Sequence, residues 1–136
     1  MKITILGSAA AEAIPNPFCK CRVCETARQQ GGRHVRARSS ALVNEDLLID
    51  CGPDLLSSAN KQSLYLGDVQ TLLMTHKHSD HWHPDNLTWR EGVFAPDLTV
   101  QMDIYGPKDT MLMVSALKLE AAKVSVNVVT GGNTWD

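Results

Sequence analysis

The sequence has no long hydrophobic run and no excess of one charge. No apolar stretch approaches the ~20 residues that a bilayer-spanning helix needs. The apolar stretch at positions 3–6 is too short for the ~7–15-residue core of a signal peptide, and Glu12 soon interrupts it. Thirteen Lys and Arg against fifteen Asp and Glu give a net charge of −2, which argues against a nucleic-acid-coating protein. We therefore expect a cytoplasmic protein that does not bind membranes and does not coat nucleic acid.

No histidine follows His83, and three of the earlier histidines lie in one short stretch. His76, His78, Asp80 and His81 come directly after an apolar run that predicts a buried strand. Imidazole nitrogen and carboxylate oxygen suit zinc, iron or manganese. In extended backbone His76 and His78 point the same way and can bind one ion together, because side chains alternate. Asp80 and His81, at the following turn, can then face a second ion. A polar loop that is His-rich by chance is the alternative.

Cysteine is scarce, and three of the four cysteines lie close together. Cys19, Cys21 and Cys24 form a C-x-C-x-x-C pattern, whereas Cys51 lies apart at a strand end. Three thiols this close cannot all pair with one another, and in a reducing cytosol they bind zinc as thiolates. A structural zinc needs a fourth ligand, for which His34 is the in-chain candidate and Cys51 a poorer one. A redox or disulfide role, or unligated thiols, are the alternatives.

The hydrophobic pattern predicts strands that alternate with helices. Strands are expected over 2–7, 40–44, 46–50, 69–75, 99–105 and 125–129, and helices over 22–30, 53–60, 84–92 and 107–122. This alternation indicates an α/β layered fold. At 136 residues and 43% apolar content, the chain is long enough for one domain with a core.

The histidine motif also resembles a known family. His-x-His-x-Asp-His after a hydrophobic strand is similar to the metal-binding motif of the metallo-β-lactamase superfamily of metallohydrolases. Residues 2–7 resemble its opening strand, and Leu-Leu-Ile-Asp-Cys-Gly at 47–52 resembles its strand that ends in Asp, a small residue and Gly. Ile-Tyr-Gly-Pro at 104–107 resembles the turn before a later helix. The resemblance implies the first half of an αββα sandwich, with residues 1–136 as its N-terminal half.

The family's later His ligands and metal-bridging Asp have no counterpart in this sequence. We therefore expect the chain to be a fragment with one bare sheet face, through which it forms a homodimer or otherwise self-associates. Each ion at the His/Asp loop would have only two protein ligands, where a catalytic zinc normally has three. The chain alone is expected to be catalytically inactive.

The cysteine cluster narrows the resemblance. A Cys-rich zinc loop at about 15–38, followed by Ser39-Ser40 at a strand start, resembles the cyclic phosphodiesterase branch that acts in phosphonate breakdown. That branch implies a structural zinc on Cys19, Cys21 and Cys24. It also implies two further divalent metals, zinc or manganese, which are held by His76, His78, Asp80 and His81 and supply a metal-bound hydroxide that attacks a small phosphodiester. Asp80 would be a ligand and the catalytic residue.

Several residues have two interpretations. Asp50 is expected to orient a ligand histidine through its second ring nitrogen, or else to cap the helix over 53–60. His83 is interpreted as a surface residue at a helix start, with metal or substrate contact as the alternative. Arg33, Arg36 and Arg38 are interpreted as a solvated basic face, with phosphate binding as the alternative.

Two other functions remain open. The chain could be a non-catalytic, zinc-stapled scaffold or binding domain, or part of an RNA 3′-end processing nuclease. The complete His/Asp motif favours an enzyme, because a decayed site loses its ligands piecemeal. The near-neutral charge and the cysteine cluster favour a small substrate over RNA.

Overall fold

The computed structural model describes residues 1–117 and 119–131, and its strands form one mixed sheet. The strands are β1 Ile3–Gly7, β2 Ser40–Val43, β3 Leu47–Ile49, β4 Thr71–Leu73, β5 Met102–Gly106 and β6 Val124–Val128. They lie side by side in chain order, and β1, β2 and β3 are antiparallel neighbours, whereas β3 to β6 run parallel. The α/β sheet expected from the alternation is confirmed.

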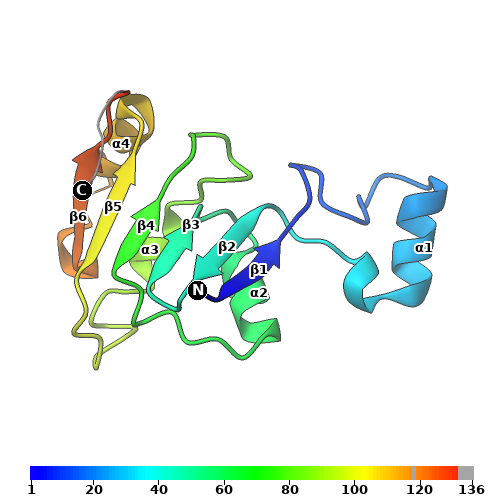
Figure 1. Cartoon of the computed structure of the whole chain (residues 1–136), viewed down its shortest axis with the longest axis horizontal. Coiled ribbons are helices and arrows are strands. Elements are labelled where there is room, and N and C mark those ends of the chain that lie inside the picture. Colours follow the sequence, from blue (N-terminus) through cyan, green and yellow to red (C-terminus); the bar gives the residue numbers. More distant parts are fainter. Residues whose placement is uncertain (118, 132–136) are drawn as a thin grey trace.

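The helices on the sheet cover one face only. They are α2 Leu55–Lys61, α3 Asp85–Thr88 and α4 Lys108–Ser115, and Figure 1 shows all three behind the sheet. A row of paired residues points toward them from neighbouring strands, and each is almost fully buried: Leu42, Leu48, Leu72 and Ile104. Burying these side chains against the helices forms the core, since apolar burial is the main favourable term in folding.

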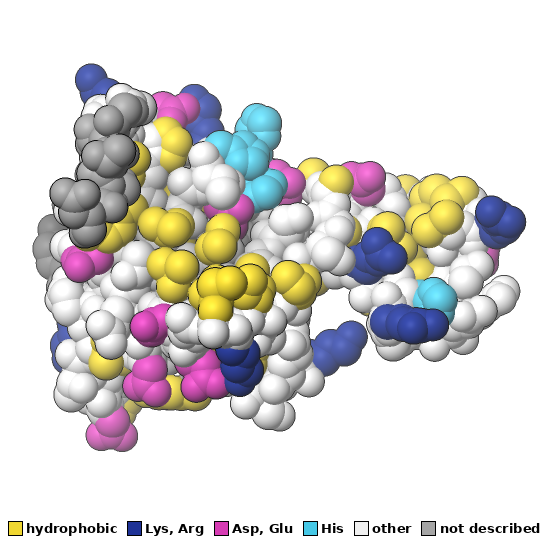
Figure 2. Space-filling view, in the orientation of Figure 1, with side chains coloured by type: hydrophobic (Ala, Val, Ile, Leu, Met, Phe, Trp, Pro, Cys, Tyr) yellow, Lys and Arg dark blue, Asp and Glu magenta, His cyan; other side chains and the backbone are white. Residues whose placement is uncertain are grey.

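The opposite face of the sheet is bare. Alternate residues of β1 and β4 point outward, and Ile3, Ile5 and Leu73 are 54%, 57% and 37% exposed. Figure 2 shows hydrophobic side chains gathered across this side of the molecule. No described element packs over these side chains, so the face stays in contact with solvent.

Residues 8–38 form an arm that projects beyond the β1 edge of the sheet (Figure 1). The arm carries α1 Arg22–Gln30 and a short 3₁₀ turn, η1 Gly32–His34. Its two ends run side by side, with bridges between Ala9 and Arg38 and between Ile14 and Arg36. The predicted Cys-rich loop therefore lies outside the core of the sheet.

Two predicted helices are shorter than expected. The helix predicted over 84–92 is only one turn, α3, because Gly92 and Pro96 follow closely and the chain turns instead. The helix predicted over 107–122 ends at Ser115, whose hydroxyl donates to the Met111 carbonyl within its own last turn. A 3₁₀ turn, η2 Glu120–Ala122, then leads into β6, and residue 118 of the predicted helix lies outside the described residues.

Candidate metal centres

The His/Asp loop lies at the carboxyl edge of the parallel strands. β3 and β4 are parallel neighbours, so the segments that follow them meet at the same edge. The Cys51 amide donates to the His81 carbonyl at 2.9 Å, and the His83 amide donates to the Cys51 carbonyl at 2.7 Å. These backbone bonds hold the loop of residues 75–83 against the end of β3.

Gly52 allows this close approach. A Cβ atom at position 52 would lie 2.2 Å from the Asp80 carbonyl oxygen, a distance that real side chains do not show. Only glycine lets the backbone at Asp80 sit this near the end of β3. Cys51 and Gly52, the small residue and the glycine after Asp50, therefore position the loop in addition to ending the strand.

Asp50 is the buried anchor of the loop. The residue is 3% exposed, and its backbone has a φ of 59°, a left-handed conformation that Asp tolerates better than most residues. Its carboxylate accepts hydrogen bonds from the Thr75 amide at 2.8 Å, from the Thr75 hydroxyl at 2.9 Å and from His81 Nδ1 at 2.6 Å. The alternative role, capping α2, is not seen: the residue before α2 is Asp54, and no side chain caps that helix.

These bonds set the proton positions on two histidines. A carboxylate can only accept, so His81 Nδ1 carries a proton and the Thr75 hydroxyl donates to Asp50. The same hydroxyl lies 2.9 Å from His76 Nδ1 and, with its own proton used, accepts from it. In a neutral ring, a proton on Nδ1 leaves the lone pair on Nε2, which is the nitrogen that would bind a metal. Thr75 positions His76, a role that was not predicted from the sequence. Its place directly before the histidine motif was the feature that could have indicated this role.

The predicted ligand side chains gather at one point of this edge. The ring centroid of His76 lies 4.7 Å from that of His78 and 4.1 Å from that of His81. The Asp80 carboxylate lies 3.3 Å from His81 Nε2. Figure 2 shows histidine side chains together at this rim of the sheet. His83 lies apart from these ring contacts, 4.0 Å from the exposed Asp85 carboxylate.

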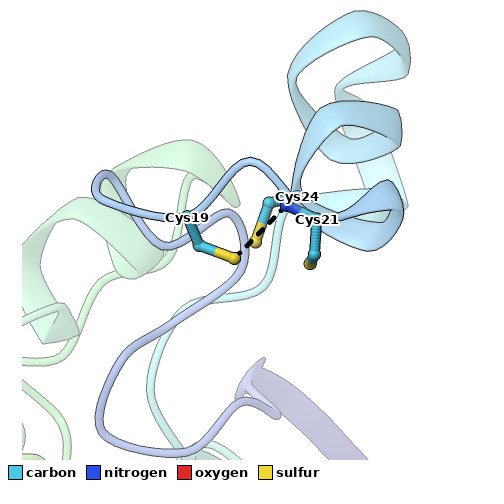
Figure 3. Close-up of side chains that lie close together, drawn as sticks. All are labelled: Cys19, Cys21 and Cys24. Carbon is cyan, nitrogen blue, oxygen red and sulfur yellow. Dashed lines mark hydrogen bonds between the residues drawn. The ribbon is translucent and has the colours of Figure 1, made fainter.

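The three cysteines of the arm form the tighter group. Cys19, Cys21 and Cys24 place their sulfurs within 4.8 Å of one another, and in the part of the chain that the structure describes no other His, Cys, Asp or Glu side chains form such a group of three. Cys19 comes from the loop, whereas Cys21 and Cys24 lie at the start of α1 (Figure 3). The Cys21 amide donates to Cys19 Sγ at 3.4 Å. Three thiols converging without a disulfide fit zinc, which prefers sulfur ligands in structural sites.

The local hydrogen bonds favour ionised sulfur in this cluster. A hydrogen bond from the Cys24 backbone, with a second from Cys19, lowers the pKa of the Cys21 thiol to about 7. The pKa of Cys24 is raised, because a bond from the Asn16 backbone that lowers it is outweighed by burial and by the two neighbouring thiols. The Cys21 thiol is therefore partly ionised near neutral pH, and a metal would have to displace the remaining protons of the cluster.

Neither predicted fourth ligand joins the cysteines. His34 lines a separate hollow of the arm with Val23 and Thr26. Cys51 is fully buried at the end of β3, and burial raises the pKa of its thiol to about 12. The expectation that one of them completes the site is not met within residues 1–117 and 119–131, because His34 faces a different hollow of the arm and Cys51 lies at the end of β3.

The sequence is similar to two kinds of curated protein. It is 33% identical over 104 residues to coenzyme PQQ synthesis protein B of Methylobacterium radiotolerans, a match that covers 68% of this chain and 34% of that protein. It is 31% identical over 119 residues to ribonuclease Z of Mycobacterium avium, covering 85% of this chain and 36% of that protein. The chain thus spans about a third of the length of these relatives. No protein-family model matches it.

Solved structures resemble the whole described fold. Zn(2+)-bound PqqB from Methylobacterium extorquens has a TM-score of 0.75 at 25% identity, and the match covers 100% of this chain and 48% of that one. A diphosphatase of the PhnP family has a TM-score of 0.72 at 22% identity, covering 94% of this chain and 50% of that one. The metallo-β-lactamase fold protein YhfI from Bacillus subtilis has a TM-score of 0.61 at 16% identity, covering 96% of this chain and 47% of that one.

Among the described helices, none combines the length and apolar character that crossing a bilayer requires.

Proposed function

Because the chain has the metallo-β-lactamase fold, about half of which it spans, we propose that it contributes the metal-binding half of a metal-dependent phosphodiesterase. The observation that carries this proposal is the Asp50 network. One buried carboxylate holds the Nδ1 atoms of two histidines, directly for His81 and through the Thr75 hydroxyl for His76, so that Nε2 is the nitrogen each ring would offer to a metal. A polar loop without a metal would not need this arrangement.

The residues at the sheet edge fit two divalent metals, zinc or manganese. His76 and His78 would hold one ion, and Asp80 and His81 would hold the other. Imidazole and carboxylate suit both metals, and neither requires a thiolate. When bound, such a metal pair lowers the pKa of water toward neutrality and acts as a Lewis acid at the phosphoryl group.

Residues of the chain itself would orient the metal-binding histidines and exchange protons with the substrate. Asp50 and Thr75 fix the imidazole tautomers, as second hydrogen-bond partners of metal-binding histidines do in other proteins. The Asp80 carboxylate lies beside His81, and its side chain keeps 13% of its surface exposed, through which it could reach a substrate. We assign it the role of ligand and of proton donor or acceptor.

The cysteine cluster would hold a third, structural zinc in the intact protein. Its ligands are Cys19, Cys21 and Cys24, and the fourth would come from outside the described residues. Zn(2+)-bound PqqB, a structural neighbour, is consistent with zinc as the metal. Free thiols at all four cysteines agree with a reducing, cytoplasmic location.

The bare sheet face leads to a proposal on assembly. The isolated chain would cover it with a second copy of itself and form a homodimer. Ile3, Ile5 and Leu73 expose apolar surface on this face, which soluble monomers rarely leave open over a large area. The relatives are two to three times longer than this chain, so in a longer protein the additional residues would cover the same face.

A second candidate is RNA 3′-end processing. It rests on the similarity to ribonuclease Z, which covers more of this chain than the PQQ synthesis protein match does. The small net negative charge favours a small phosphodiester over RNA. A non-catalytic zinc-stapled scaffold is the third reading, and it would not need the Asp50 network.

The test is phosphodiesterase activity in a longer protein that contains this chain. With zinc or manganese, Asp80→Ala should abolish hydrolysis of bis(4-nitrophenyl) phosphate and leave the melting temperature almost unchanged. Asp97→Ala, which removes an exposed carboxylate away from the loop, is the matched control. Residues 1–136 alone should be inert with either metal. An unchanged rate in Asp80→Ala would refute the catalytic assignment, and tRNA 3′-end cleavage without diester hydrolysis would favour the nuclease.

A further inference from the structure

A second site lies between the arm and the sheet, away from the histidines. A cleft of about 610 Å³ separates residues 13–15, 32–33 and 35–37 of the arm from the end of β1 and from α2. Figure 2 shows a notch there with Lys and Arg side chains on both sides. We propose that this cleft binds a phosphate-bearing organic anion of nucleotide size, which bridges the arm and α2.

The charge of the cleft is positive on both walls. Arg33 and Arg36 line it from the arm, and Lys61 lines it from the last turn of α2. Within residues 1–117 and 119–131, none of these three side chains forms an ion pair, although the protein as a whole is slightly acidic. Three cations that converge on one cleft without carboxylate partners attract an anion, and Arg binds phosphate in a bidentate geometry.

The one acid of the cleft is already neutralised. Asp54 forms an ion pair with Arg38 at 2.8 Å and also accepts from the Arg38 amide at 2.8 Å. Arg38 therefore does not belong to the binding set, in contrast to the basic stretch considered from the sequence. The Arg38 guanidinium donates to the carboxylate of Asp54, directly before α2, and to the Ala11 carbonyl, and so links the base of the arm to the start of α2.

A serine hydroxyl adds a polar group that an anion could use. Ser58 lines the cleft, the residue is 7% exposed, and no hydrogen bond of its hydroxyl is found among the described residues. The hydroxyl is not among the buried side-chain atoms that lack a partner, so it is open to solvent in the cleft and can donate to an incoming group. A phosphate oxygen held by Lys61, one turn further along α2, could accept from it.

The size and lining of the cleft set the class of ligand. Its volume falls within the range of about 300–1,000 Å³ that is typical of small-molecule sites. Ile14 and Val35 of the arm form an apolar wall beside the cations. A bare phosphate would not contact that wall, whereas a phosphate ester with a ring or other apolar group would contact both the cations and the apolar wall. Adenosine 5′-diphosphate has this chemistry and is a suitable probe.

The experiment is calorimetric titration of the protein with adenosine 5′-diphosphate at low salt and without added metal. Binding should be measurable and should weaken as salt is added. Arg33→Ala, Arg36→Ala and Lys61→Ala should each reduce the affinity about five-fold, the usual order for one exposed charge contact. All three side chains are exposed, so the variants should fold, and circular dichroism checks this.

Two controls separate this site from others. Lys20→Ala removes an exposed cation of the same arm that does not line the cleft, and it should change the affinity less than two-fold. The pair His76→Ala and His78→Ala should leave binding intact, which distinguishes this cleft from the proposed metal site. No binding in the unmodified protein, equal losses in Lys20→Ala and Arg36→Ala, or loss of binding in the histidine variants would each overturn the proposal.

Discussion

The carboxylate of Asp50 lies 2.6 Å from Nδ1 of His81, although 30 residues separate them in the chain. The same carboxylate binds Thr75, whose hydroxyl reaches His76. A single buried charge at the end of β3 thus determines which nitrogen each of two histidines presents. Together with the backbone bonds between the loop and Cys51, and with the burial of Trp82 in the core, this network gives the loop a defined shape.

We first predict the effect of removing the Thr75 hydroxyl. Thr75→Val keeps the shape of the side chain but breaks the link from Asp50 to His76, so His76 can adopt either tautomer. Cobalt(II) affinity of the histidine site should fall roughly ten-fold, as for other partners of metal ligands. Optical titration separates this site from the cysteines, because thiolate ligands give charge-transfer bands. Thr99→Val, in an exposed loop, should bind cobalt like the unmodified protein, and an equal affinity in both variants would contradict the network.

A second prediction concerns Gly52. Gly52→Ala places a Cβ atom 2.2 Å from the Asp80 carbonyl oxygen, so the loop must move. The free energy of unfolding should fall by about 1–3 kcal/mol, the usual cost of overpacking, and metal affinity of the histidine site should fall with it. Urea denaturation measures the first and cobalt titration the second. Gly92→Ala is the matched control, since nothing lies within 4 Å of its Cβ, and it should not be destabilised.

A third prediction follows from the cysteine pKa values. The pKa of Cys21 is lowered to about 7 and that of Cys51 is raised to about 12. Thiolate is the reactive form, so iodoacetamide should modify Cys21 at a rate that rises through pH 7 and levels off above it. Cys51 should stay unmodified at pH 8, being both protonated and buried. Peptide mass spectrometry gives the rates, and saturating zinc should protect Cys21. Faster modification of Cys51 than of Cys21 would contradict the structure.

The fourth prediction concerns the bare sheet face. Ile5→Lys places a charge in the middle of this face, where Ile5 is 57% exposed, and should shift the isolated chain from dimer to monomer. Light scattering after gel filtration measures the mass. Leu112→Lys changes a side chain of similar exposure on α4, 63%, which points away from the sheet, and should leave the dimer intact. A monomeric unmodified chain at all concentrations would exclude self-association through this face.

The ends of the longer helices show where local pattern is insufficient. The helix over 22–30 was predicted with its observed bounds, because Gly31 and Gly32 stop it and both have positive φ. The helix over 107–122 was predicted too long, because its apolar residues continue past Ser115 without a stop signal. Its end is determined by the need to return the chain to the start of β6 beside β5, which is a tertiary requirement.

The sequence by itself determined the class of fold and the metal-binding residue types. Alternating apolar strands and helices require a layered sheet, and the spacing of His76, His78, Asp80 and His81 follows directly from the chain. Only the tertiary structure decided which groups meet. It joined Asp50 and Thr75 to two histidines, held the cysteines apart from His34, and opened a basic cleft beside α2. These relationships depend on how parallel strands bring distant segments to one edge, and residue spacing carries no information about that.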